Sequence, residues 1–178
     1  PDATAYVHDQ VWDLGGGVTV RAHHLPGHTA GHSALVVENE GVAFIGDIDL
    51  TGFGPYYGDA TSDLAAFRRS LREVRALDAR VWVTSHHRGV VTDRQVFLQA
   101  LDRFSAKLEE RSDKLIGYLR DGPQTLDELV ARRLLYPAGF VLPYVDCAER
   151  RSIALHLLEL QEEGVVQRHP DDRYALRS

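Results

Sequence analysis

Three side chains of the types that bind metal ions each come just after an apolar stretch of the sequence. His28 follows residues 18–25 through a Pro-Gly turn, and Asp47 and His86 end the later stretches GVAFIGD and VWVTSH. Because strand ends meet at the rim of a sheet, these three side chains can point to one place. Imidazole and carboxylate groups are good ligands for Zn²⁺ and for Fe or Mn. The pattern therefore predicts a metal site with His28, Asp47 and His86 as ligands.

Neighbouring residues leave alternatives open at two of these positions. Adjacent residues of a strand point to opposite sides, so only one of His86 and His87 can face the metal, and we favour His86. Asp49 could take the place of Asp47 and is otherwise a turn residue.

The other histidines and the loop tyrosines are expected to have structural roles. This group comprises His23 and His24 as structural or rim residues, His8, His156 and His169 as surface or helix residues, and Tyr56 and Tyr57 as packing or loop-anchoring residues that could also touch substrate.

These segments resemble the C-terminal half of the metallo-β-lactamase-like hydrolase superfamily. The resemblance rests on the phrase HTAGH beginning at His28, the Gly-Asp turn at Asp47 and the histidine ending a late strand, His86; residues 46–58 also look like one subgroup of uncharacterised metal-dependent hydrolases. It implies two metals, with Zn²⁺ expected and Fe or Mn as alternatives. His28 would bind one metal, His86 the other, and Asp47 would bridge both as the catalytic carboxylate, while His32 supports its neighbour by a hydrogen bond.

The resemblance also implies a fold and a reaction. The fold would be α+β, namely the second half of an αββα metallo-β-lactamase-like sandwich followed by a small winged-helix-like domain. The reaction would be metal-dependent hydrolysis of a small-molecule substrate, in which metal-activated water attacks a carbonyl or phosphorus centre. The motifs leave a thioester, a lactone, an amide and a phosphodiester open as substrates.

The sequence departs from the superfamily in one respect. The signature His-x-His-x-Asp-His loop, which supplies most of the ligands, occurs nowhere in it. Since the chain has no Met, we interpret Pro1 as an internal position of a longer protein and expect this fragment alone to be inactive. Half a sandwich leaves one apolar sheet face uncovered, so we expect pairing with the missing N-terminal half or self-association.

Composition narrows the class of protein. The 178 residues allow one ordinary domain and a small one, with 44% hydrophobic and 26% charged residues as in globular proteins. No apolar run approaches the roughly 18 residues of a membrane span, and no signal-peptide pattern is seen. A single cysteine, Cys147, suits a reducing compartment and is expected to be a small buried residue, so we predict a cytoplasmic protein. The net charge of −6 argues against a nucleic-acid partner.

Residues 1–112 are expected to form the sandwich half. Helical spacing over 59–77, with Ser62 or Asp63 as its cap, predicts one helix, and 93–120 predicts a long one, capped by Asp93, that could break near 112–113. The expected strands are 18–25, 34–38, 42–45 and 81–84, with a hairpin between the second and third and a loop over 51–58.

Residues 113–178 are expected to form the winged-helix-like domain. The predicted elements are helices 114–120, 125–134 (with a capping box from Thr125) and 148–163, then a hairpin of 165–168 with 173–176. This tail gives an alternative function: a non-catalytic binding or regulatory module that contacts DNA or a protein partner. Arg150 and Arg151 on its third helix are accompanied by several glutamates, which favours packing, dimerisation or a substrate-cleft role over DNA binding.

Overall fold

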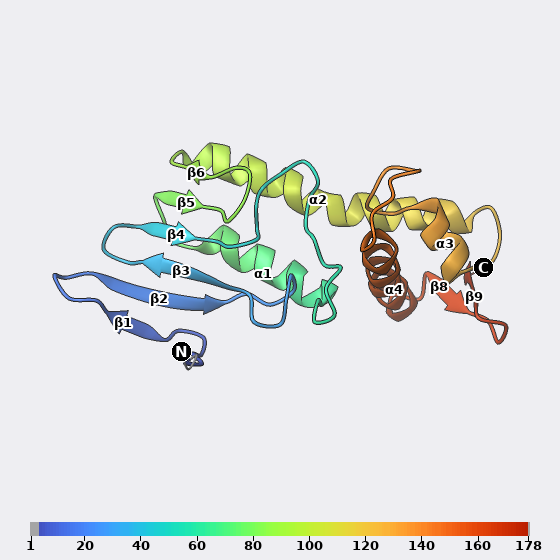
Figure 1. Cartoon of the computed structure of the whole chain (residues 1–178), viewed down its shortest axis with the longest axis horizontal. Helices are drawn as coiled ribbons and strands as arrows, with labels where there is room; N and C mark the ends of the chain where they lie inside the picture. Colours follow the sequence, from blue (N-terminus) through green and yellow to red (C-terminus); the bar gives the residue numbers. More distant parts are fainter. Residues whose placement is uncertain (1–3, 178) are drawn as a thin grey trace.

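The computed structural model describes residues 4–177 and shows an α+β protein with a mixed six-stranded sheet at one end and a smaller helical part at the other (Figure 1). The long helix α2 runs through both. The six strands of the large sheet are β1 (Val11–Asp13), β2 (Thr19–His24), β3 (Ser33–Val37), β4 (Val42–Phe44), β5 (Val81–Val83) and β6 (Val90–Val91).

The large sheet keeps its strands in sequence order, β1-β2-β3-β4-β5-β6. All neighbours are antiparallel except β4 and β5, and the β3–β4 hairpin expected from the sequence is present. A parallel pair needs a crossover, which is supplied here by α1 (Leu64–Ala76). Asp63 caps this helix by accepting a hydrogen bond from the amide of Ala66 at 2.7 Å.

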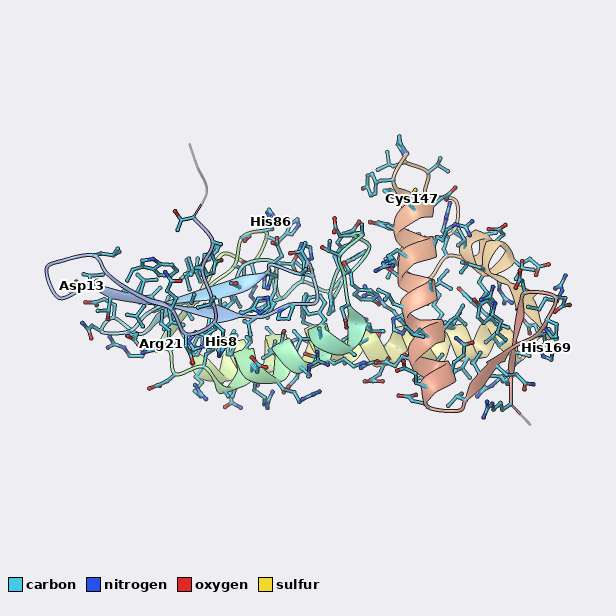
Figure 2. All side chains as sticks on the ribbon, turned by 90° about the horizontal axis from the view of Figure 1, so that it is seen from below. His8, Asp13, Arg21, His86, Cys147 and His169 are labelled. Atoms are coloured by element: carbon cyan, nitrogen blue, oxygen red, sulfur yellow. The ribbon has the colours of Figure 1, made fainter. Side chains whose placement is uncertain are left out.

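Helices α1 and α2 cover only one face of this sheet (Figure 2). Side chains that are paired across neighbouring strands point to the same face, and the row on the helical side is Val36, Ala43, Trp82 and Val91, all buried. The Trp82 ring stacks on Phe97 of α2, with ring centroids 4.2 Å apart and planes 6° apart.

The opposite face of the sheet is apolar but is not covered by a helix of the described chain. Its row is Leu35, Phe44, Val83 and Val90. The exposed fraction is 39% for Phe44 and 62% for Val90. A contiguous apolar surface of this kind marks a place where another surface packs.

Helix α2 (Arg94–Leu119) is continuous, so the break considered near 112–113 is wrong, and residues 114–119 belong to this helix instead of forming a separate one. Asp93 caps it as predicted, accepting from the amide of Val96 at 2.9 Å. The helix contributes to two hydrophobic clusters, because Leu108 closes the cluster under the large sheet and Leu115 opens the second. The division into 1–112 and 113–178 remains a prediction.

The second cluster is enclosed by short elements of the tail. These are β7 (Gln124–Thr125), α3 (Leu126–Arg132), α4 (Val145–Glu162), β8 (Val166–Arg168) and β9 (Arg173–Leu176), with sheet order β7-β9-β8. Thr125 and Glu128 form the predicted capping box at α3. That this part of the chain is a winged-helix-like domain stays a prediction. None of the helices described over residues 4–177 is long and apolar enough to cross a membrane.

A buried chain of hydrogen bonds joins the two clusters. Tyr57 Oη lies 2.7 Å from Nε2 of His156 on α4, and His156 Nδ1 lies 2.9 Å from Oγ of Ser112. Ser112 in turn donates to the Leu108 carbonyl at 3.3 Å. These contacts are satisfied if His156 is neutral, accepting from Tyr57 and donating to Ser112. His156 is therefore a fully buried helix residue and not a surface one.

Burial also shifts the pKa of His156 and the pKa of its hydrogen-bond partner Tyr57. Loss of solvation lowers the pKa of His156 to about 3 and raises the pKa of Tyr57 to about 12. Cys147, expected to be buried, is exposed, because it falls on the side of α4 that faces away from the second cluster.

The stability of the fold should depend on pH through His156. An unfolded histidine has a pKa near 6.5, so the unfolded chain binds one more proton than the folded chain between about pH 6.5 and 3. The free energy of unfolding should therefore fall with falling pH in this window, by about 1.4 kcal/mol per pH unit from this residue. Urea unfolding at several pH values should show a shallower dependence for His156→Gln. His169→Gln, at a half-exposed turn, should keep the original slope; equal slopes in all three proteins would contradict the prediction.

Candidate functional site

The turn that presents His28 is fixed against the start of α1. Ser70 donates to the Pro26 carbonyl at 2.7 Å, and Ser62 donates to the His28 carbonyl at 2.6 Å. Gly27 has φ +136°, and a Cβ at this position would lie 2.3 Å from Cα of Phe67. Only glycine allows the turn to lie this close to the helix. The sequence Pro-Gly-His thus sets the position of the imidazole through backbone packing.

A carbonyl of the loop after Asp47 orients the His28 ring. Nδ1 of His28 lies 2.8 Å from the carbonyl oxygen of Tyr56, and since a carbonyl can only accept, Nδ1 carries the proton. In the neutral imidazole Nε2 is then an acceptor, and it faces Oδ2 of Asp47 at 3.7 Å. Two acceptors that face each other across a few ångströms are favourably joined by a cation. The donor chemistry therefore fits a metal ion.

Asp47 is positioned by His32 through the backbone. The Asp47 amide donates to His32 Nε2 at 3.0 Å, and His32 Nδ1 donates to the Leu25 carbonyl at 2.8 Å. Both ring nitrogens of the buried His32 are thus used, and burial lowers its pKa. Gly46 has φ +57°, and a Cβ there would lie 2.5 Å from His32 Nε2. His32 therefore supports the turn that carries Asp47, by the kind of hydrogen bond expected of it.

The structure brings His86 to the other side of the same carboxylate. Nε2 of His86 lies 3.1 Å from Oδ1 of Asp47. His86 and His87 both follow the end of β5, so strand alternation does not separate them; His87 instead has φ +56° in the turn. Asp49, the alternative to Asp47, accepts hydrogen bonds from the amide and hydroxyl of Thr51 at 3.1 and 2.9 Å. Asp49 therefore closes a local turn.

His28, Asp47 and His86 thus come together from three separate segments, but they do not form a complete ligand set. Their side chains are 19%, 33% and 63% exposed, and within residues 4–177 no three His, Cys, Asp or Glu side chains are arranged to hold a metal ion by themselves. The two pairwise contacts meet only at Asp47. The arrangement can orient ligands along one side of a metal site, and their ligand roles remain predictions.

Sequence reasoning missed Arg111, which holds the loop beside the site. Arg111 on α2 is buried and donates to the Phe53 and Pro55 carbonyls and to Tyr57 Oη. A signal was present, because Arg111 falls three residues after Leu108 and four before Leu115, on the apolar face of α2. A charged residue in such a stripe needs internal partners.

Comparison with known proteins identifies the family of the segment that carries these residues. The profile of the Metallo-beta-lactamase superfamily matches residues 9–86, the segment that contains His28, Asp47 and His86. Residues 9–86 belong to the metallo-β-lactamase superfamily. The solved structure of a metallo-beta-lactamase family protein from Thermus thermophilus superimposes with a TM-score of 0.79 and 31% identity, covering 99% of this chain and 55% of that one.

Other relatives agree in fold or in part of the sequence. A Beta-lactamase domain protein from Burkholderia ambifaria has a TM-score of 0.75 at 19% identity, covering 99% of this chain and 53% of its own, which shows the shared fold. An atrochrysone carboxyl ACP thioesterase from Aspergillus fumigatus is 32% identical over 103 residues, 58% of this chain and 31% of the relative. A hydroxyacylglutathione hydrolase from Methylococcus capsulatus is 28% identical over 120 residues, 67% of this chain and 45% of the relative. The chain thus spans less than half the length of these two enzymes.

The superfamily turn at Gly27 provides a stability test. In Gly27→Ala the new methyl group would meet the backbone of α1 at a strained φ, so the free energy of unfolding should drop by at least about 2 kcal/mol. Gly31→Ala, in the same turn but with nothing within 4 Å of the position that its methyl group would occupy, should change it by less than about 0.5 kcal/mol. Urea unfolding measures both. Equal stability of the two variants would show that the turn is not packed as described.

Proposed function

We propose that this chain is the part of a metal-dependent hydrolase that carries His28, Asp47 and His86. The observation that carries the proposal is the convergence of the two imidazoles on the Asp47 carboxylate, with His28 oriented by the Tyr56 carbonyl. The names of the relatives support hydrolysis, since they are a thioesterase and a hydroxyacylglutathione hydrolase. Within this proposal Zn²⁺ is the expected metal, two ions would be bound, and Fe or Mn are alternatives.

The chain's own residues have defined tasks in this reaction. His28 would hold one metal through Nε2, His86 would hold the other, and Asp47 would be a ligand of both. The bound metals supply Lewis-acid polarisation of the scissile carbonyl and of a water nucleophile. Tyr56 and His32 keep His28 and Asp47 in place before any ligand arrives, which lowers the cost of assembling the site. The remaining ligands are not among His28, Asp47 and His86, so catalysis would need further residues.

We propose a thioester as the substrate class. The sequence motifs left lactones, amides and phosphodiesters open as well. The names of two relatives favour a thioester, because one is a thioesterase and the other hydrolyses an acylglutathione, which is a thioester. Hydrolysis would add water across the carbonyl–sulfur bond, releasing a carboxylic acid and a thiol.

The metal assignment can be tested in a form of the protein that hydrolyses a thioester. His28→Ala or Asp47→Asn should abolish hydrolysis and bound metal together, because each removes a ligand from the site. His87→Ala is the matched control for His86→Ala, since both are exposed turn histidines but only His86 faces Asp47. Metal content by mass spectrometry and thioester hydrolysis are the measurements. Full activity in Asp47→Asn, or equal loss in His87→Ala and His86→Ala, would refute the assignment.

The alternative of a DNA-binding tail receives no specific support from the contacts of α4. Arg150 pairs with Asp127, and Arg151 donates to the carbonyls of Ala60 and Ser62 at 3.2 and 3.1 Å. Both arginines of α4 are thus engaged in contacts within the chain. The Arg151 contacts favour a role in packing the tail against the rest of the protein.

We further propose that the open face of the large sheet is covered by a second apolar surface. In a longer protein this surface would come from the other half of the sandwich; in the isolated chain a second copy would provide it. Burying apolar surface yields about 25 cal/mol per Å², so an uncovered face drives association.

Association through this face gives a further prediction. Phe44→Lys places a charge in the middle of the apolar row and should shift the isolated chain towards monomer. Leu158→Lys, at a 54% exposed position on α4, should leave the association unchanged. Sedimentation velocity over a range of concentrations measures it. A wild-type chain that stays monomeric throughout the range would contradict the proposal.

A further inference from the structure

A hollow of about 520 Å³ lies where the loop after Asp47 meets α2 and the segment before α4. Phe53 lines it from the loop, Lys107 and Lys114 from α2, and Tyr136 and Phe140 from the tail. Its volume suits a ligand of one or two rings. Residues from both hydrophobic parts of the protein are therefore needed to form it.

Three aromatic rings make one wall of this hollow. Tyr136 stacks on Phe140 with ring centroids 5.4 Å apart and planes 9° apart, and Phe53 lies 5.6 Å from Tyr136. Phe53 is 39% and Phe140 40% exposed. Exposed aromatic rings that already lie beside one another offer a planar ligand stacking contacts without rearrangement.

Two buried ionic side chains hold this wall rigidly. The fully buried Glu149 accepts hydrogen bonds from the consecutive amides of Leu134, Leu135 and Tyr136 at 2.7 to 3.1 Å. Arg111 holds the facing loop through the Phe53 carbonyl at 2.6 Å. The backbone is thus held at Tyr136 and at Phe53, two of the three residues of the wall, as expected of a preorganised binding site.

The lining of the hollow contains three cations, Lys107, Arg111 and Lys114, against one carboxylate, Glu110, although the chain as a whole is acidic. Lys107 and Lys114 are the two lysines of the sequence, and both line this hollow. Lys107 pairs with Glu110. Lys114 donates to the Leu134 carbonyl at 3.1 Å and makes no ion pair within residues 4–177. Burial lowers the pKa of Lys114, so its ammonium group would gain from an anion placed beside it.

We propose that this hollow binds a planar aromatic group bearing an acidic substituent, with the ring against Phe53 and Tyr136 and the anion beside Lys114. The same loop carries Tyr56, whose carbonyl orients His28, so the ligand would be the non-reacting part of the substrate. That last assignment rests on the proposed hydrolase function. The binding itself does not.

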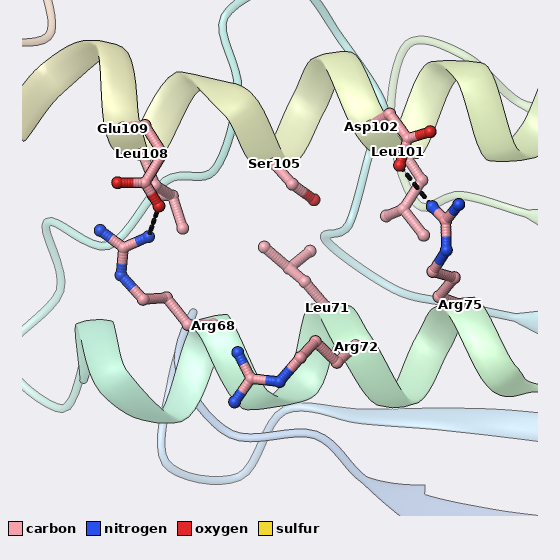
Figure 3. A pocket seen from close by; sticks show the side chains of 9 residues that line it. All are labelled: Arg68, Leu71, Arg72, Arg75, Leu101, Asp102, Ser105, Leu108 and Glu109. Carbon is pink, nitrogen blue, oxygen red and sulfur yellow. Dashed lines mark hydrogen bonds and ion pairs between the residues drawn. The ribbon is translucent and has the colours of Figure 1, made fainter.

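The groove between α1 and α2 on the far side of α2 shows why charge alone does not select this site. Figure 3 shows Arg68 paired with Glu109 and Arg75 paired with Asp102 across that groove. Its cations are largely compensated and it contains no aromatic ring. Arg72, which lines the groove without such a pair in Figure 3, therefore provides a control for removing a positive charge elsewhere.

The test is binding of 2-naphthoate to the chain without added metal, followed by the fluorescence anisotropy of the ligand. We expect saturable binding, weakened about fivefold or more by Phe53→Leu and by Lys114→Gln. Phe44→Leu is the matched control for the ring, because Phe44 on the open sheet face has the same 39% exposure as Phe53. Arg72→Gln is the control for the charge. Both controls should bind like the wild type.

Two further measurements separate this site from non-specific uptake. Cyclohexanecarboxylate, which has the charge without the planar ring, should compete poorly. Reaction with an amine reagent should show, by mass spectrometry, that 2-naphthoate protects Lys114 but not the terminal amine. The proposal is overturned if 2-naphthoate does not saturate, if Phe44→Leu weakens it as much as Phe53→Leu, or if Lys114 is not protected.

The outcome is independent of catalysis. Binding by the wild type together with no hydrolysis in an intact enzyme would refute only the proposed hydrolase function. Hydrolysis together with absent 2-naphthoate binding would refute only the hollow as an aromatic-anion site.

Discussion

The buried guanidinium of Arg111 is the contact on which most of the functional region depends. It donates to two carbonyls and to the Tyr57 hydroxyl, all in one loop. That loop contributes the Tyr56 carbonyl to His28 and the Phe53 ring to the aromatic wall. Through Tyr57 it also reaches His156 on α4. One side chain of α2 therefore connects the candidate metal site, the aromatic hollow and the tail.

Only arginine suits this position. A buried cation loses its hydration, and the loss must be balanced by hydrogen bonds in fixed directions. The guanidinium fork can serve three acceptors at once, whereas a lysine ammonium on a flexible stem could not span them in a defined geometry. The Phe53 and Tyr57 rings also lie 5.2 and 5.3 Å from the guanidinium carbon, which adds cation–π attraction. The negatively charged Glu149 has a corresponding role, because it accepts hydrogen bonds from three backbone amides of the facing segment. A buried cation and a buried anion thus order two loops without pairing with each other.

Much of the secondary structure could be predicted because it is encoded locally. The caps Asp63, Asp93 and Thr125 act on amides three residues away, and the strands of the β3–β4 hairpin are adjacent in sequence. What could not be predicted depends on distant partners. The ring of His156 is buried because Tyr57, 99 residues earlier, lies against it. Likewise, the sequence predicted a possible helix break at Ser112 and the aspartate beside it. In the structure α2 stays helical through Ser112, because this residue bonds to His156 and to its own helix.

The candidate site also combines features that the sequence predicts with features that it does not predict. The three ligand-type residues could be selected from the sequence because each comes just after an apolar strand, and a shared sheet rim then places them close together. The groups that hold these residues in place could not be predicted, because every residue has a backbone carbonyl and the sequence does not show which one, here that of Tyr56, will bind the histidine. Since His28 and Asp47 are oriented by Tyr56 and His32, hydrogen bonds and close glycine contacts organise this side of the site. A side of a metal site that is ordered in this way can accept ligands from another polypeptide surface without refolding. The open apolar sheet face gives such a surface a place to pack.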